Sequence, residues 1–238
     1  MTYEKKRKIF FYSILASVLI AILLITATFL VNAISPSVKT ALFVIILIIL
    51  VVVLLTLKSK FEYYNFVTKY HLLIENGNDP KESNIKIGSP AWFKKLKENN
   101  FVIYRDFTKF KMYYRFDQVT SKNKRSKAAV LIVEIVEDIT FENQEIVHAV
   151  NQFEDDFMKK EKFRNHIVLQ FKNTSDFNQE NIETTQNISF IKPVKNHYVI
   201  IINCLYSVSE KQAFFVNSDT HSPNHYYTYA ADIVNKLV

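Results

Sequence analysis

Residues able to do acid–base, nucleophilic or metal chemistry are scattered along this chain. His221 and His225 have the four-residue spacing of a zinc pair on a helix, but Pro223 lies between them and no Cys or Glu set accompanies them. The single cysteine, Cys204, lies in an apolar run, so we interpret it as a small buried side chain rather than a catalytic thiol. We therefore expect no metal ion and no cofactor.

Composition argues against several further classes of protein. The chain has two glycines in 238 residues, too few for a glycine-rich phosphate loop or a dinucleotide fingerprint. It also lacks a serine nucleophile elbow and a kinase motif set, so we expect it not to be an enzyme. The formal net charge is +7, but residues 58–238 carry only +3, so nucleic acid is not expected as a partner.

Two uncharged apolar segments near the N-terminus predict a membrane anchor. Residues 9–33 and 40–57 are each close to the length of about 20 residues that a transmembrane helix needs. Pro36 ends the first helix, because proline has no N–H group to donate. The first segment is too long for the apolar core of a cleaved signal peptide. We predict a transmembrane hairpin over residues 9–57, preceded by a basic tail at 1–8.

The charges around these segments predict their orientation. Basic residues are concentrated before the first segment and after the second, and the connecting loop contains a single lysine. By the positive-inside rule, both termini are cytoplasmic and the protein is a multi-pass protein of the plasma membrane. The flanking basic residues are Lys5, Lys6, Arg7, Lys8, Lys58 and Lys60, and the loop lysine is Lys39.

Small residues recur every four positions along the first apolar segment, at Ser13, Ser17 and Ala21. Small side chains at this spacing allow helices to approach closely in lipid. Two interpretations remain open: packing within the hairpin, and self-association into a homo-oligomer.

The remainder of the chain predicts a membrane-anchored α+β protein with one cytoplasmic domain, residues 89–238. Residues 58–88 are expected to be a juxtamembrane helix (61–75) and a polar linker. Period-2 alternation and apolar runs predict strands, and apolar residues at three- to four-residue spacing predict helices. These elements suggest one mixed sheet with flanking helices. The expected strands are 101–107, 110–116, 128–136, 166–172, 198–206 and 213–216, and helices are expected from 89, over 142–161 and from 222.

The order of these elements over residues 90–172 resembles the core of the PD-(D/E)xK nuclease superfamily. In that family, an Asp on the second strand and a Glu-x-Lys on the third hold a metal ion and activate water. Here Asp117 ends the second predicted strand and Glu134 lies in the third, but Val136 stands where the lysine would be. Gln170 and Lys172 have the motif's spacing on a different strand. The resemblance therefore implies a degenerate domain of this type.

Charge is uneven within the predicted domain. Residues 92–127 contain eleven Lys or Arg and three acidic residues, whereas residues 128–161 contain nine acidic residues and two lysines. The predicted loop 121–127 is the most basic part, and it can attract anionic lipid headgroups. Alternatively, it pairs with the acidic helix 142–161. Its basic residues are Lys122, Lys124, Arg125 and Lys127.

We expect a bacterial-type integral membrane protein whose cytoplasmic domain is a non-catalytic binding or scaffolding module. Its expected partners are the lipid bilayer and a protein partner or a second copy of the chain. Two alternatives remain: an inner-leaflet lipid-binding or sensing domain that recognises anionic headgroups, and the degenerate nuclease-like domain.

Overall fold

The computed structural model describes residues 2–119, 127–186 and 199–238. The chain divides into two compact units, Met1–Leu72 and Leu73–Val238. The first unit consists of helix α1 (Tyr3–Leu30) and most of helix α2 (Pro36–Glu75). Each helix is long and apolar enough to cross a membrane, by length and composition. Helix α2 continues without a break through residues 58–75, which confirms the expected helix beyond the second apolar segment.

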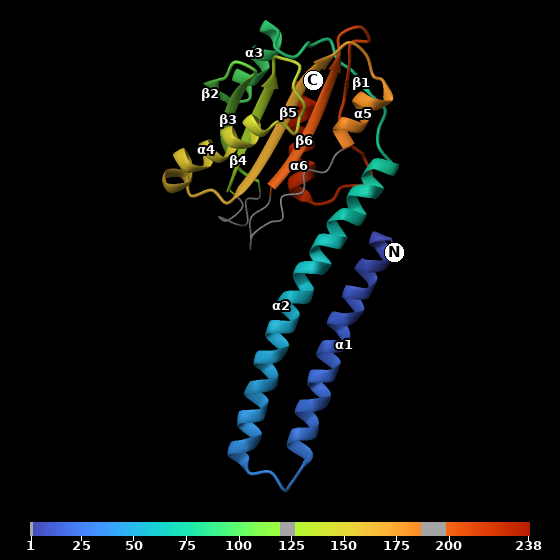
Figure 1. The fold of residues 1–238 in the computed structure, drawn as a ribbon, viewed down its shortest axis with the longest axis vertical. Coiled ribbons are helices and arrows are strands. Elements are labelled where there is room, and N and C mark those ends of the chain that lie inside the picture. Colours follow the sequence, from blue (N-terminus) through green and yellow to red (C-terminus); the bar gives the residue numbers. More distant parts are fainter. Residues whose placement is uncertain (1, 120–126, 187–198) are drawn as a thin grey trace. The chain divides into compact units, whose positions relative to one another are not determined.

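The second unit is built on a mixed seven-stranded sheet in the order β1-β7-β6-β5-β4-β3-β2 (Figure 1). The three central strands β4, β5 and β6 are parallel, and all other neighbouring strands are antiparallel. Together with its helices, this sheet confirms the α+β class. The strands are β1 (Lys81–Glu82), β2 (Val102–Asp106), β3 (Phe110–Gln118), β4 (Lys127–Ile135), β5 (Asn165–Thr174), β6 (Val199–Ser207) and β7 (Gln212–Phe214).

Helices cover both faces of the sheet. Helices α4 (Gln144–Glu161) and α5 (Gln179–Gln186) lie on one face, in front of the sheet in Figure 1. Helices α3 (Pro90–Glu98) and α6 (His225–Leu237) lie on the other face. Because successive side chains of a strand point to opposite faces, each strand supplies both layers of the core. The strand β4 is accordingly apolar and buried almost throughout, as its sequence predicted.

The layer beneath α4 is aromatic. Phe153 is fully buried, and its ring lies 5.2 Å from Tyr104, 5.2 Å from Tyr114 and 4.7 Å from Phe157. Aromatic pairs at these separations stabilise a core beyond their apolar area. The three- to four-residue spacing of apolar side chains in 142–161 thus corresponds to the buried side of α4.

Capping residues fix where these helices begin. Ser89 Oγ accepts a hydrogen bond from the backbone N–H of Trp92 at the start of α3, as predicted from Ser89 and Pro90. Asn143 caps α4 in the same way. Helix α6 begins at His225 after the cap Asn224, two residues later than expected from Ser222.

The chain between Glu75 and α3 is attached to the sheet, although residues 76–88 were expected to be a linker. Strand β1 pairs with β7, and the Ser83 N–H donates to the carbonyl of Lys211. The Tyr206 hydroxyl donates to the carbonyl of Ser83 at 3.2 Å. The second unit therefore begins at Leu73, which lies well before the expected boundary at residue 89.

Candidate functional site

A row of polar side chains runs along β5 on the face that α4 and α5 cover. Gln170, Lys172 and Thr174 share this face because they alternate along the strand. In the register of the parallel strands, Gln170 lies opposite Asn203 of β6. Buried strands of a parallel sheet are usually apolar, so this row requires an explanation other than packing.

The deepest part of the row is a relay of side-chain amides. Gln170 Nε2 donates to Asn203 Oδ1 at 3.1 Å, and Asn203 Nδ2 donates to the carbonyl oxygen of Thr184 at 3.3 Å. A carbonyl oxygen can only accept, so Thr184 fixes the orientation of both amides. The other end is then Gln170 Oε1, which is buried and has no hydrogen-bond partner among the described residues.

An unpaired buried carbonyl oxygen lowers stability by about 1–3 kcal/mol relative to a paired one. Both amide side chains belong to residues that are only 4 % exposed. Gln170 Oε1 can accept a hydrogen bond from an N–H or O–H group. A group that binds to this atom must therefore be a hydrogen-bond donor.

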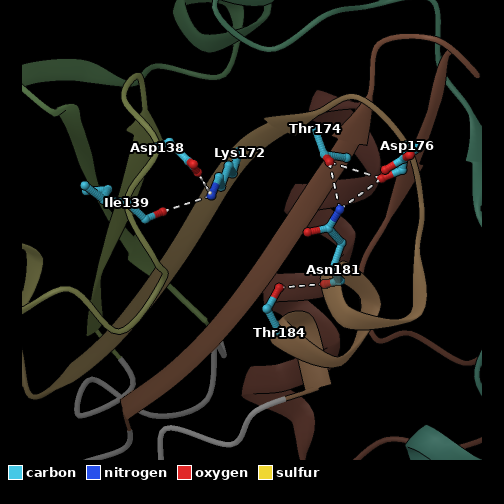
Figure 2. A network of polar contacts seen from close by, with 7 residues as sticks. All are labelled: Asp138, Ile139, Lys172, Thr174, Asp176, Asn181 and Thr184. Atoms are coloured by element: carbon cyan, nitrogen blue, oxygen red, sulfur yellow. Dashed lines mark hydrogen bonds and ion pairs between the residues drawn. The ribbon is translucent and has the colours of Figure 1, made fainter.

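Lys172 continues the row toward the carboxyl end of β5. Its Nζ contacts Asp138 Oδ1 at 2.7 Å and donates to the carbonyl oxygen of Ile139 at 3.1 Å (Figure 2). The hydrogen bond from Lys172 lowers the pKa of Asp138. The side chain of Asp138 is 97 % exposed, so this carboxylate can be exchanged for another anion without uncovering the core.

The loop between β5 and α5 closes the row on its other side. Asn181 Nδ2 donates to Thr174 Oγ1 at 3.1 Å and to the carbonyl of Asp176 at 3.3 Å (Figure 2). Thr184 Oγ1 donates to the carbonyl oxygen of Asn181 at 2.6 Å. These bonds hold the start of α5 against the end of β5, at the edge where ligands bind in many open parallel sheets.

The opposite face of the sheet carries a buried carboxyl group at Glu134. Tyr113 OH donates to Glu134 Oε2 at 3.0 Å. The backbone of Gly88 lies against the other carboxyl oxygen, Oε1. Burial raises the pKa of Glu134, although the Tyr113 hydrogen bond and the charge of Lys111 act in the opposite direction. Perturbed carboxyl groups are frequent in functional sites, and they also occur in structural networks.

The structure does not bring the nuclease-like residues together. Asp117 lies opposite Ala128, whereas Glu134 lies opposite Lys111. The two carboxylates are therefore six positions apart along β4, about 20 Å, and cannot share a metal ion. Asp117 instead accepts hydrogen bonds from Arg115 and Tyr229. Within residues 2–119, 127–186 and 199–238, no group of three or more metal-ligating side chains occurs.

The structure also describes three residues that the sequence analysis weighed for thiol or metal chemistry: Cys204, His221 and His225. Cys204 is fully buried, and burial raises the pKa of its thiol, which fits the interpretation as a small core side chain. His225 is the first residue of α6 and His221 precedes the helix, so these two histidines do not share a helical face.

Lys127 is the one predicted basic-loop residue in the described part of the chain. It is the first residue of β4 rather than a loop residue, and its Nζ contacts Glu161 Oε2 at 2.7 Å. For this residue, pairing with the acidic helix is what the structure shows. Lys122, Lys124 and Arg125 lie outside the described residues, so their proposed role stays a prediction.

The small-residue stripe lies on α1. Ser17 Oγ donates to the Ser13 carbonyl at 2.8 Å within the helix, and Ala21 is buried. An apolar hollow next to Ser17 and Ala21 is also lined by Ile49 and Leu50 of α2. These contacts occur between α1 and α2 and do not test self-association.

No protein-family model, no curated protein and no solved structure was found to match the chain.

The polar row was missed from the sequence because its members lie far apart in the chain. The available signal was a single polar residue inside an otherwise apolar strand. Asn203 interrupts the apolar run 198–206, and Gln170 interrupts the apolar stretch 167–171. Isolated amides in buried strands require partners, so they mark positions where the core is built around hydrogen bonds.

Proposed function

We propose that this protein is a membrane-anchored binding module without catalytic activity. In this proposal, α1 and α2 form a transmembrane hairpin, and the sheet domain lies in the cytoplasm with both termini. The basic residues that flank the apolar segments support this orientation. Ring contacts between Phe10 and Tyr64, and between Phe29 and Phe43, support antiparallel pairing of the helices.

The observation that carries the binding function is the open end of the amide relay at Gln170. A buried acceptor without a partner is costly, so a donor group that reaches Gln170 Oε1 would be bound favourably. The neighbouring Lys172 holds an exposed carboxylate that a partner's anionic group can replace. We infer that the partner presents a hydrogen-bond donor to Gln170 and an acidic group to Lys172.

Photo-crosslinking in cells tests this surface. A photoreactive residue replaces Glu183, an exposed residue of α5 beside the row, and a matched control replaces Lys94 on α3, on the opposite face. We expect a discrete higher-mass product from position 183 alone. This product should weaken when Gln170→Met removes the acceptor at nearly constant volume. No product at 183, or equal products at both positions, would contradict the proposed surface.

A reporter fusion tests the topology separately. An alkaline-phosphatase fusion after Val238 should be inactive, because that enzyme requires export. Activity outside the cell would place the sheet domain on the other side of the membrane.

A further inference from the structure

The first unit contains a cluster of rings and cations where the apolar segments end. The Phe10 and Tyr64 rings stack at 5.3 Å with an angle of 7° between their planes. The Tyr3 ring stacks on His71 at 5.1 Å. Each pair joins α1 to α2, so the cluster fixes how this end of the helix pair is packed.

Two lysines lie over the rings of the opposite helix. Lys6 of α1 has its Nζ 5.3 Å from the centre of the Tyr64 ring, and Lys60 of α2 has its Nζ 5.7 Å from the centre of the Phe10 ring. Lys6 precedes Phe10 by one turn, and Lys60 precedes Tyr64 by one turn. Because the helices are antiparallel, the two ammonium groups lie on opposite sides of the Phe10–Tyr64 stack along the helix axes.

Neighbouring lysines have a different environment. Lys8 contacts Glu4 at 2.8 Å and Lys58 contacts Glu62 at 3.7 Å, each within its own helix. Among the described residues, the ion pairs include no carboxylate partner for Lys6 or Lys60. An ammonium group over an aromatic face keeps N–H donors free for a second ligand.

We propose that Lys6, Lys60 and the Phe10–Tyr64 stack form a binding site for the phosphate headgroup of an anionic phospholipid such as phosphatidylglycerol. The inference rests on the proposed membrane anchoring. Lys60 follows the second apolar segment, and its side chain extends toward Phe10, as lysines do at a membrane surface. The tyrosine rings favour the headgroup level, and Tyr64 presents a hydroxyl group there. The lipid phosphate lies at Lys60, and the outer headgroup oxygens lie toward Lys6.

The ligand chemistry, a phosphate ester, is shared by lipids and by soluble phosphates. The position of the site at the end of two apolar segments favours the lipid as its source. A direct contact between a lysine ammonium group and a phosphate oxygen is a charge-assisted hydrogen bond, which a lysine outside the site does not make. We expect each of the two contacts to contribute about fivefold in binding, which corresponds to about 1 kcal/mol.

Native mass spectrometry of the full chain in mild detergent measures the site directly. Phosphatidylglycerol and phosphatidylcholine of equal chain length are offered together, and the bound ratio is recorded. We expect a preference for phosphatidylglycerol that falls about 25-fold in Lys6→Gln/Lys60→Gln. The control Lys8→Gln/Lys58→Gln removes the same charge and should retain most of the preference. Equal loss in both variants would show a diffuse charge effect and overturn the site.

Further arms separate the remaining outcomes. Lys6→Arg/Lys60→Arg replaces the same two residues but keeps the charge and the ring contacts, so it should retain the preference. A loss in the Arg variant as well would mean that any replacement at these positions disturbs the helix pair. Millimolar glycerol 3-phosphate should not displace the lipid, and displacement would identify a soluble phosphate ester as the ligand. Alkaline carbonate extraction tests the anchor itself. Release of the chain from membranes would refute the anchoring, whereas retention without lipid preference would refute only this site.

Discussion

Gly88 lies directly against the buried carboxyl group of Glu134. A methyl group added at Gly88 would meet Glu134 Oε1 at 2.6 Å, and Gly88 has a φ of +78°. The positive φ is the feature that requires glycine at this position, because other residues are strained there. The Glu134 carboxyl group is the end of a side chain, so it would have to move aside if Gly88 carried a methyl group.

We expect Gly88→Ala to lower the free energy of unfolding by about 1–3 kcal/mol, since a non-glycine residue at positive φ is strained and its Cβ meets the carboxyl oxygen. Gly77→Ala is the control, because its nearest contact would be the Ile74 carbonyl at 3.2 Å without a positive φ. Denaturant unfolding followed by the fluorescence of the buried Trp92 gives both values. Equal effects of the two substitutions would contradict the requirement for glycine at residue 88.

The raised pKa of Glu134 predicts a pH dependence of stability. The folded protein holds this proton more tightly than the unfolded chain, so the contribution is full below the unfolded pKa of about 4.3 and is lost as the pH rises through the folded pKa. Glu134→Gln should flatten this decline, by about 1.4 kcal/mol for each unit of pKa difference. Unfolding measured from pH 4 to 9 tests it.

The matched control for this pH series is Glu98→Gln, which removes an exposed carboxyl group of α3. Its stability curve should keep the wild-type slope. If Glu134→Gln and the wild type decline in parallel, the Glu134 carboxyl group is not the source of the pH dependence.

Arg115 joins strand β3 to the connection between α3 and β2 and should not tolerate lysine. Its Nε contacts Asp117 at 2.7 Å, its Nη1 donates to the Asn99 carbonyl at 2.6 Å, and its guanidinium lies 4.4 Å from the Phe101 ring centre. Lysine cannot make the two directed bonds together, so Arg115→Lys should cost about 1–3 kcal/mol. The exposed Arg164→Lys should change thermal stability little, and similar losses in both would contradict this role.

The sequence was informative where local chemistry decides the structure. Period-2 alternation predicted β3, the apolar run predicted β4, and Ser89 with Pro90 predicted the start of α3. Strand β1 was missed, because Lys81 and Glu82 are polar and exposed and carry no pattern. Their strand conformation results from pairing with β7, which is remote in the chain.

The candidate site was less accessible from sequence than the fold. Gln170 and Asn203 become neighbours only through the parallel pairing of β5 and β6, and no local signal sets that register. Helix α5 was not among the expected helices because its sequence is polar. It forms Gln179–Gln186, and the carbonyl of Thr184 then terminates the amide relay.

The attached segment 73–88 predicts where a stable fragment begins. Residues 73–238 should unfold cooperatively, whereas residues 86–238 should have a lower midpoint. The shorter fragment lacks β1 and leaves the buried Tyr206 hydroxyl without the Ser83 carbonyl, a loss of about 1–3 kcal/mol. Circular dichroism on heating compares them. Lys81→Ala in the longer fragment is the control, since β1 pairs through its backbone, and equal midpoints of the two fragments would refute this boundary.

The pairing of β1 with β7 also sets an order of events during synthesis. Lys81 pairs with Ala213, so the first strand of the sheet leaves the ribosome about 130 residues before the strand β7 that pairs with it. At 5–20 residues per second, that interval is on the order of 10 s. Both apolar helices emerge earlier still, and long-range pairings form slowly. The domain therefore completes its sheet only after both apolar helices have been made, and the edge formed by β1 and β7 closes only once residues 212–214 have emerged.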